Sequence, residues 1–456
     1  MNKQRIGGYQ LVMFVSILYI HSGTISLFKV LAEVSGQDAW FNFYFPMLYA
    51  LFISFLLYRL SCRFPGKNMF QISEEICGKT VGRLINALAL FDIIHLLVRD
   101  LRLFGDFVGT SILTRTPLEY ILFISILVLI YYGTGNLEEL ARAVNLLFPS
   151  FICSILLMPF LLLNEMQINN IEPVLANGWQ RVLNGGFLGT GWAGDVFVMG
   201  MFLPNVKTAR QFYVLTRYGI VLSAAVLTIL MVLNTTVLGV SITSRAMYPN
   251  YTLMEQINIT DFIDRLDLAL IVFWMPMYLL KVILLYFAFM AGLSTFLKTD
   301  KMRSMNIMSG WFLLMLTLVS FNSVIEAYLF GNYAFTPLTL LVHACFFGAV
   351  FGFAAIRRLK GRRLGELRAD DANDAGPGAM RDPERQNGPM IGRFRGGVRT
   401  YGIRAALAVC FIAILFGGYT GHFNQKYGIM GGAAYFASFI VLLVLVAREA
   451  RALRKS

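Results

Sequence analysis

The sequence predicts an all-α polytopic membrane protein, and three observations support this fold class. The chain has 456 residues, of which 57% are hydrophobic and 14% are charged, whereas soluble domains carry about 25% charged residues. Several runs reach the roughly 20 apolar residues that a transmembrane helix requires. Two of these runs, the first and the sixth along the chain, are interrupted by glycine and polar residues in their interior.

The hydrophobic runs divide the chain into three predicted parts. The apolar segments predict twelve spans, at about 9–32, 39–60, 83–109, 118–134, 143–163, 187–204, 215–243, 266–296, 308–327, 335–356, 401–420 and 428–447. Residues 357–400 are rich in charge, glycine and proline, so this segment cannot bury a core and is expected to be disordered. We therefore predict a ten-span core (1–356), a disordered charged cytoplasmic linker (357–400) and a C-terminal two-span hairpin with a basic tail (401–456).

The basic residues predict the orientation in the membrane. With the N-terminus inside, most of the 39 Lys and Arg residues fall in cytoplasmic segments, and this asymmetry places both termini in the cytoplasm. The formal charge of +13 is then explained by loops beside the lipid bilayer, so no nucleic acid partner is expected. The sequence shows no Walker loop, no His/Glu metal cluster and no nucleophile with a base, so we expect no enzyme, no cofactor and no metal site.

The sixth span carries one carboxylate inside a glycine-rich segment. Asp195 lies near the middle of Gly185–Pro204 and follows Gly186, Gly189, Gly191 and Gly194. An unpaired charge at this depth would cost roughly 3 kcal/mol. The segment 21–25 interrupts the first span at a similar depth, and two broken helices at corresponding positions of two halves indicate a transporter-type binding site. The alternative for each glycine alone is close helix packing.

The third span has a polar face. Its residues are spaced 3, 4, 3 and 4 apart, which places them along one side of a helix: Asp92, His95, Arg99, Arg102 and Asp106. One interpretation is a structural ladder in which two acids and two bases neutralise one another. The other is that Asp92 and His95 border a central cavity.

Lys281 lies at the midpoint of the eighth span. A lysine at this depth cannot easily reach the membrane surface, so it needs a partner within the protein. Asp195 and Asp92 are the candidate partners at a matching depth. Its ammonium would then take the place of a coupling sodium ion, or the pair would be purely structural.

The interrupted helices also predict the chemistry of the ligand. Half-helix N-termini offer free N–H groups and a positive dipole end to an anion, while free carbonyl groups can hold an ammonium. A zwitterionic amino acid or a similar small polar nutrient fits such a site.

Several short motifs, taken together, show a resemblance to a known family. They are Ile6–Gln10, Gln37–Trp40, Arg63–Lys67, Gly78–Gly82, Leu101–Asp106, Thr116-Pro117 and the acidic Asp195 of the sixth span. The chain resembles the B subunit of bacterial spore germinant receptors, a branch of the amino acid–polyamine–organocation superfamily.

This resemblance implies a LeuT-like five-plus-five inverted-repeat bundle of ten helices in the spore inner membrane. Here two extra C-terminal transmembrane helices follow. The bundle would bind a small germinant, often an amino acid, and act with an A subunit and a lipoprotein C subunit. Carried over by position, the ligand-binding residues would be Gly23, Thr24, Ile25, Asp92, His95, Trp192, Gly194, Asp195, Val196 and Lys281.

The extra pair of spans keeps a second function open. A twelve-span chain also suits a secondary transporter, or permease, for amino acids or polyamines. Neighbouring genes for A and C subunits would favour the receptor, and substrate uptake by this chain alone would favour the transporter.

Overall fold

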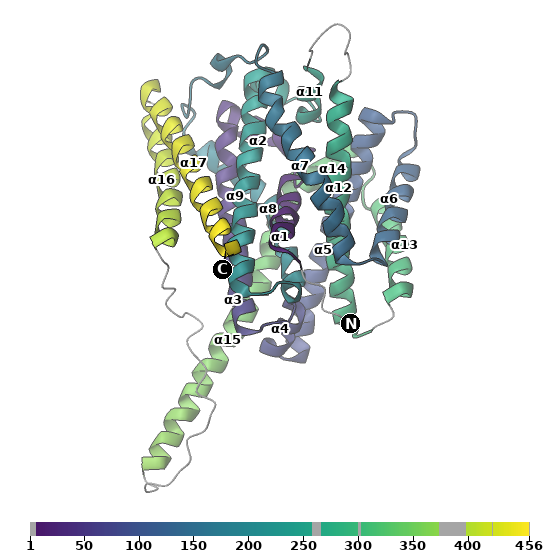
Figure 1. Ribbon diagram of the computed structural model, residues 1–456, viewed down its shortest axis with the longest axis vertical. Helices are drawn as coiled ribbons and strands as arrows, with labels where there is room; N and C mark the ends of the chain where they lie inside the picture. Colours follow the sequence, from purple (N-terminus) through teal and green to yellow (C-terminus); the bar gives the residue numbers. More distant parts are fainter. Residues whose placement is uncertain (1–5, 258–265, 300–301, 374–397, 422, 456) are drawn as a thin grey trace.

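The computed structural model describes residues 6–257, 266–299, 302–373, 398–421 and 423–455, and the regular structure in these ranges is helical. Nine helical segments among them are long and apolar enough to cross a membrane, and two shorter apolar helices accompany them, Gly8–Ile20 and Leu118–Gly133. The helices stand side by side in one bundle (Figure 1). The all-α membrane fold is thereby confirmed.

The first predicted span is broken where the sequence indicated. Helix α1 (Gly8–Ile20) ends before His21, and α2 (Leu27–Ser35) begins six residues later. Gly23, between them, has φ +80°, a left-handed conformation that glycine adopts without the steric cost of a side chain. After α2, the 3₁₀ helix η1 (Gly36–Phe43) leads into α3 (Tyr44–Arg63).

The sixth predicted span changes its helix type instead of opening at its first glycines. Helix α8 (Trp179–Ala193) continues through Gly186, Gly189 and Gly191, and the 3₁₀ helix η4 (Gly194–Asn205) follows directly. A Cβ at Gly189 would lie 2.7 Å from Pro46 Cγ. The earlier glycines therefore serve close helix packing, and the irregularity begins at Gly194.

The other predicted spans of the core coincide with helices or pairs of helices. In chain order the remaining elements of the core are α4 (Met69–Cys77), α5 (Lys79–Phe107), η2 (Val108–Ile112), α6 (Leu118–Gly133), α7 (Leu137–Leu161), η3 (Ile168–Ile171), α9 (Ala209–Leu233), η5 (Asn234–Leu238), α10 (Gly239–Thr243), α11 (Pro249–Glu255), α12 (Leu266–Leu297), α13 (Met302–Ser320), α14 (Val324–Leu329), η6 (Phe330–Ala334) and α15 (Phe335–Asn373). The broken first span lies in the interior, where α1 packs against α7, α9, α12 and η4. The total of twelve spans stays a prediction.

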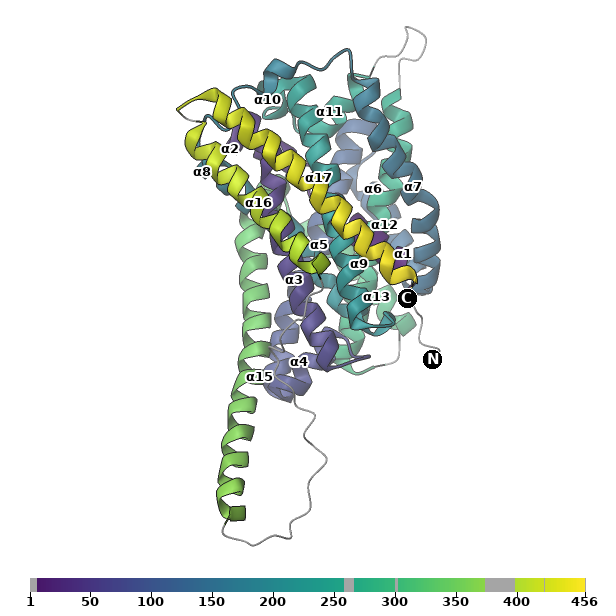
Figure 2. The ribbon, with the colours of Figure 1, turned by 60° about the vertical axis from the view of Figure 1, so that its left-hand side comes forward.

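The last two helices form a hairpin on the outside of the bundle. Helices α16 (Val398–Thr420) and α17 (Gln425–Lys455) pack against each other, α17 also packs on α9, and both cross the bundle obliquely (Figure 2). Tyr435 of α17 meets Phe41 and Trp40 with ring centroids 5.0 and 5.7 Å apart. An ion pair joins the buried Arg217 of α9 to the half-buried Glu449 of α17.

The segment that was expected to be a disordered linker begins as helix. Helix α15 continues beyond the bundle to Asn373 (Figure 2), and Arg357 donates a hydrogen bond of 2.9 Å to the Glu75 carbonyl near the end of α4. Residues 374–397 of the expected linker lie outside the described residues.

The charge asymmetry generates a topology prediction. In a background without the five native cysteines, single cysteines at 380 or 390 should react with a membrane-impermeant maleimide only after the cytoplasmic face is opened. Cysteines at 170–180 should react in intact cells, because the basic segments remain inside. Labelling of residue 380 from outside would contradict the orientation.

Candidate ligand-binding site

Asp195 is the point at which four segments of the chain meet. It is fully buried in the first turn of η4. Its Oδ2 lies 3.1 Å from Arg99 Nη2 of α5 and 2.9 Å from Lys281 Nζ of α12. The Ser22 hydroxyl, in the break between α1 and α2, donates a hydrogen bond to the same oxygen.

A second acid completes this arrangement. Asp100 lies 2.6 Å from Lys281 Nζ and 2.9 Å from Arg99 Nη2. We call Arg99, Asp100, Asp195 and Lys281 the ion cluster; all four side chains are 0% exposed. Two cations face two anions, so the ion cluster carries no net charge when all four groups are ionised. That balance matters because an isolated ion in the interior is strongly unfavourable.

Aromatic rings hold the ion cluster in place. The Arg99 guanidinium lies over Trp192 of α8 and Phe335 of α15, 3.9 and 4.3 Å from the ring centroids. Such cation–π contacts replace part of the hydration that a buried guanidinium loses. The Tyr278 hydroxyl donates to the Asp100 carbonyl at 3.2 Å, which ties α12 to α5 beside Lys281.

The predicted pairing of Lys281 with Asp195 is confirmed, and the alternative pairing with Asp92 is wrong. Asp92 is buried next to α15 instead, with Oδ2 3.4 Å from His343 Nε2. Thr339 donates to its other oxygen at 3.3 Å. On the far side of the imidazole, Tyr49 is hydrogen-bonded to Nδ1 at 2.8 Å.

The polar face of the third span divides among separate environments. Arg99 enters the ion cluster, whereas Arg102 pairs with Asp106 at 3.1 Å and donates to the Phe321 carbonyl at 2.6 Å. His95 packs against Phe91, with ring centroids 4.0 Å apart, and lines a groove between α5, α13 and α14. The ladder interpretation therefore fits Arg102 and Asp106, while Asp92 and His95 do not join Asp195.

The residues of the helix break lie directly beside the ion cluster. A Cβ at Gly23 would be 2.7 Å from Leu27 Cβ and 3.3 Å from Trp192 Cδ2. The Thr24 carbonyl accepts a 2.7 Å hydrogen bond from Asn250. Within the described part of the chain, the N–H groups of Gly23, Thr24 and Ile25 donate no hydrogen bond. The predicted free donors are thus present at this break.

The other two predicted residues lie in the core on the η4 side. Gly194 is close to α15, since a Cβ there would be 2.7 Å from Thr339 Cγ2 and 3.2 Å from His343 Cε1. Val196 is fully buried. Gly194 thus connects the surroundings of Asp195 and Asp92: it precedes Asp195 in the sequence and lies next to His343, which pairs with Asp92.

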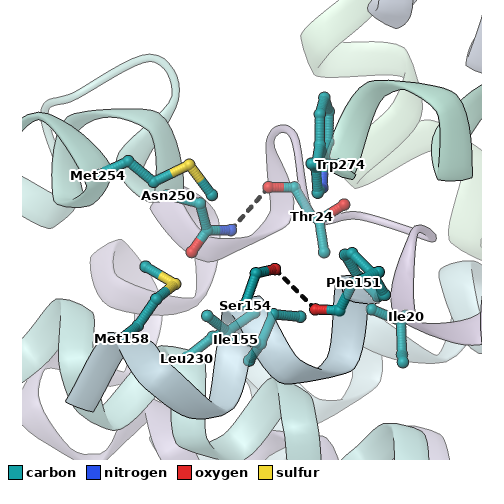
Figure 3. A pocket seen from close by; sticks show the side chains of 10 residues that line it. All are labelled: Ile20, Thr24, Phe151, Ser154, Ile155, Met158, Leu230, Asn250, Met254 and Trp274. Atoms are coloured by element: carbon teal, nitrogen blue, oxygen red, sulfur yellow. Dashed lines mark hydrogen bonds between the residues drawn. The ribbon is translucent and has the colours of Figure 1, made fainter. Parts of the chain in front are cut away.

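A small cavity adjoins the break on the side of α7, α9, α11 and α12. Its volume is about 20 Å³, and Figure 3 shows its lining: Ile20, Thr24, Phe151, Ser154, Ile155, Met158, Leu230, Asn250, Met254 and Trp274. A second cavity of about 20 Å³ shares Thr24, Asn250 and Trp274 and adds Ile25. Each has room for about one water molecule, so an amino acid could enter only after these helices separate.

Sequence reasoning did not identify Asp100, Asn250 or Trp274. Asp100 had a signal, because it follows Arg99 in a span that also carries Asp92 and Asp106. Asn250 and Trp274 had none, since their approach to Thr24 depends on how α11 and α12 fold back over the break.

Comparisons with known proteins place this geometry in context. Residues 5–325 match the model of the family described as "Spore germination protein". Spore germination protein KB of Bacillus subtilis (strain 168) is 27% identical over 302 residues, which cover 65% of this chain and 80% of the relative. Spore germination protein YndE of the same organism is 25% identical over 289 residues, covering 62% and 79%.

Solved structures share the fold. Mhp1, a nucleobase-cation-symport-1 family transporter in a closed conformation with bromovinylhydantoin bound, aligns with a TM-score of 0.56 at 12% identity, covering 98% of this chain and 94% of that one. MhsT in complex with L-phenylalanine aligns with a TM-score of 0.55 at 12% identity, covering 98% and 99%. Both are LeuT-fold transporters, so the LeuT-like fold is confirmed.

The ion cluster generates a double-mutant prediction. Lys281→Met leaves a net charge of −1 in the cluster and Asp195→Asn leaves +1, so each should destabilise the protein by about 3–5 kcal/mol. In the double variant the cluster is neutral again, so its loss of unfolding free energy should be clearly smaller than the sum of the losses in the two single variants. Denaturant unfolding of the purified chain in detergent measures the free energies.

Asp92→Asn supplies the matched control for this cycle. Asp92 contacts His343 and not Lys281, so its combination with Lys281→Met should be additive within about 0.5 kcal/mol. Strict additivity of the Lys281 and Asp195 variants would show that these two side chains do not interact.

Proposed function

The chain belongs to the spore germination protein family, and from this membership we propose that it is the membrane subunit of a nutrient-germinant receptor. It would bind a small germinant, such as an amino acid, at the break of the first span and thereby trigger germination. We place it in the spore inner membrane with both termini in the cytoplasm, and we propose an A subunit and a lipoprotein C subunit as its partners.

One observation carries the proposal: the hydrogen bond from Ser22 to Asp195. This bond links the only non-helical segment inside the first span, among the described residues, to a buried ion cluster that spans α5, η4 and α12. A ligand that enters at Gly23–Ile25 must displace or reorient Ser22. Its binding energy can then act on the helices that the ion cluster holds together, which is what a receptor requires.

The charge balance of the site indicates the ligand class. The ion cluster is neutral and its acids are already paired with Arg99 and Lys281. A ligand with a net charge would therefore remain uncompensated in the interior, whereas a zwitterion or an uncharged nutrient would not. The free N–H groups of the break suit a ligand carboxylate. The cavities beside Thr24 and Ile25 have linings without a charged side chain, so they would suit an apolar ligand side chain once the surrounding helices separate.

Ten residues form the predicted site, and the geometry supports them unequally. The break contains Gly23, Thr24 and Ile25. Two members of the ion cluster, Asp195 and Lys281, also belong to the predicted site. Trp192 packs against both the break and the ion cluster. Gly194 and Val196 position Asp195 at the start of η4. Asp92 and His95 lie outside this arrangement, so we propose no direct ligand contact for them.

A secondary transporter is the second candidate function, and the shared fold of Mhp1 and MhsT favours it. The Lys281 ammonium beside two carboxylates would act there in place of a coupling sodium ion. Uptake separates the two functions. If the chain is a receptor subunit, proteoliposomes that contain it alone should accumulate no more labelled amino acid than protein-free liposomes, and saturable uptake would instead establish transport.

The helix break generates the main functional test. Gly23→Leu should abolish the germination response, because Gly23 has φ +80° and a side chain there would collide with Leu27 and Trp192. Gly23→Ala adds the same backbone strain, about 1–2 kcal/mol, with a smaller group, so it should shift the dose curve to higher nutrient concentration. Germination is measured against nutrient concentration, with protein levels checked by immunoblot.

Gly78→Ala is the matched control for Gly23→Ala. Gly78 has φ +86°, and an added Cβ would meet nothing within 4 Å. It therefore introduces comparable backbone strain at the junction of α4 and α5, away from the ion cluster, and should leave the dose curve unchanged. A wild-type dose curve for Gly23→Leu at normal protein level would overturn the proposed binding site.

A further inference from the structure

A groove of about 640 Å³ lies where the start of α1, the start of α9 and the end of α17 come together. Figure 2 shows the end of α17 beside α9 and α1. The groove is lined by Gly8, Tyr9, Val12, Lys207, Thr208, Arg210, Gln211, Leu215, Tyr218, Ala447, Ala450, Arg451 and Leu453. We call it the basic groove, and it is separate from the ion cluster and from the break at Gly23.

The basic groove combines unneutralised positive charge with an apolar wall. Lys207, Arg210 and Arg451 are exposed, and none of them forms an ion pair with an acid in the part of the chain that the structure describes. Its lining contains no Asp or Glu. Apolar surface beside the three cations comes from the exposed ring of Tyr9 and from the half-buried Tyr218 and Leu453.

The C-terminal hairpin builds one side of this groove. The ion pair between Arg217 and Glu449 fixes α17 against α9, and Glu449 lies two residues before Arg451. Four of the lining residues, from Ala447 to Leu453, belong to α17. The family match ends at residue 325, so the groove depends on a helix outside the matched region.

If both termini lie in the cytoplasm, as the charge asymmetry predicts, the basic groove lies at the cytoplasmic end of the spans, at the level of the lipid headgroups. Basic pockets between helices on this side of a membrane are suited to anionic lipid headgroups. A phosphate bound by two or three cations also gains charge-assisted hydrogen bonds. The apolar wall can contact an anion favourably where that anion carries a hydrocarbon chain, as a phospholipid does.

We propose that the basic groove is a binding site for an anionic phospholipid. The phosphodiester headgroup lies between Lys207, Arg210 and Arg451, and one acyl chain packs against Tyr9, Tyr218 and Leu453. The lipid thereby connects α17 to α1 and α9.

The test uses the purified full-length chain in detergent, titrated with phosphatidylglycerol and followed by native mass spectrometry. Phosphatidylglycerol should bind in preference to phosphatidylcholine, and millimolar inorganic phosphate should not displace it. The variant Arg210→Gln/Arg451→Gln should weaken binding about 30-fold, which corresponds to about 2 kcal/mol for two basic residues beside an anionic headgroup.

The variant Lys79→Gln/Arg83→Gln is the control, because it removes the same charge from exposed residues outside the groove. It should bind phosphatidylglycerol as the wild type does, and both variants should keep the wild-type thermal unfolding midpoint. Equal loss in both variants, equal binding of phosphatidylcholine, or displacement by inorganic phosphate would each overturn the proposal. None of these outcomes affects the germinant site, whose test is the Gly23 dose curve.

Discussion

The architecture of the bundle interior depends on the mutual neutralisation of Arg99, Asp100, Asp195 and Lys281. No single one of these ionised side chains could remain charged where it lies without the others, because removal from water costs several kcal/mol per ion. The four groups come from α5, η4 and α12. Their balance therefore fixes how these helices approach one another, in depth and in rotation about their axes. Ser22 extends the same constraint to the broken first span.

This constraint also explains why the irregular backbone is tolerated. Non-helical segments at membrane depth persist only where protein or water satisfies their polar groups. At the break, Asn250 binds the Thr24 carbonyl and Asp195 binds the Ser22 hydroxyl, whereas several N–H groups remain without a partner among the described residues. A ligand that supplied acceptors to these N–H groups would complete the set.

Much of the fold could be predicted from the sequence, because the bilayer imposes strong rules on composition. Long apolar runs located the helices, and the polar residues from His21 to Ile25 located the break of the first span. The pairing of Lys281 with Asp195 followed from the cost of leaving either one alone. The family motifs then indicated the LeuT-like arrangement, which no hydropathy pattern contains.

The sequence-based predictions were wrong where a residue's environment depends on helices that are distant in the sequence. Helical spacing placed Asp92 and Arg99 on one face, but only the position of α15 explains why Asp92 binds His343. The glycines of α8 predicted a break, yet each of them makes room for a neighbouring side chain, as Gly189 does for Pro46 and Gly191 for Thr336. The composition of residues 357–373 predicted disorder, but helix α15 extends through them.

The hairpin of α16 and α17 makes this core dependent on its own C-terminus. Its removal would expose Trp40 and Phe41, which now pack on Tyr435, and would leave Arg217 without Glu449. A chain truncated before α16 would thus expose aromatic rings and a guanidinium that the hairpin now covers. The same hairpin occupies one flank of the bundle, so a second membrane subunit must either pack on a different flank or contact the hairpin itself.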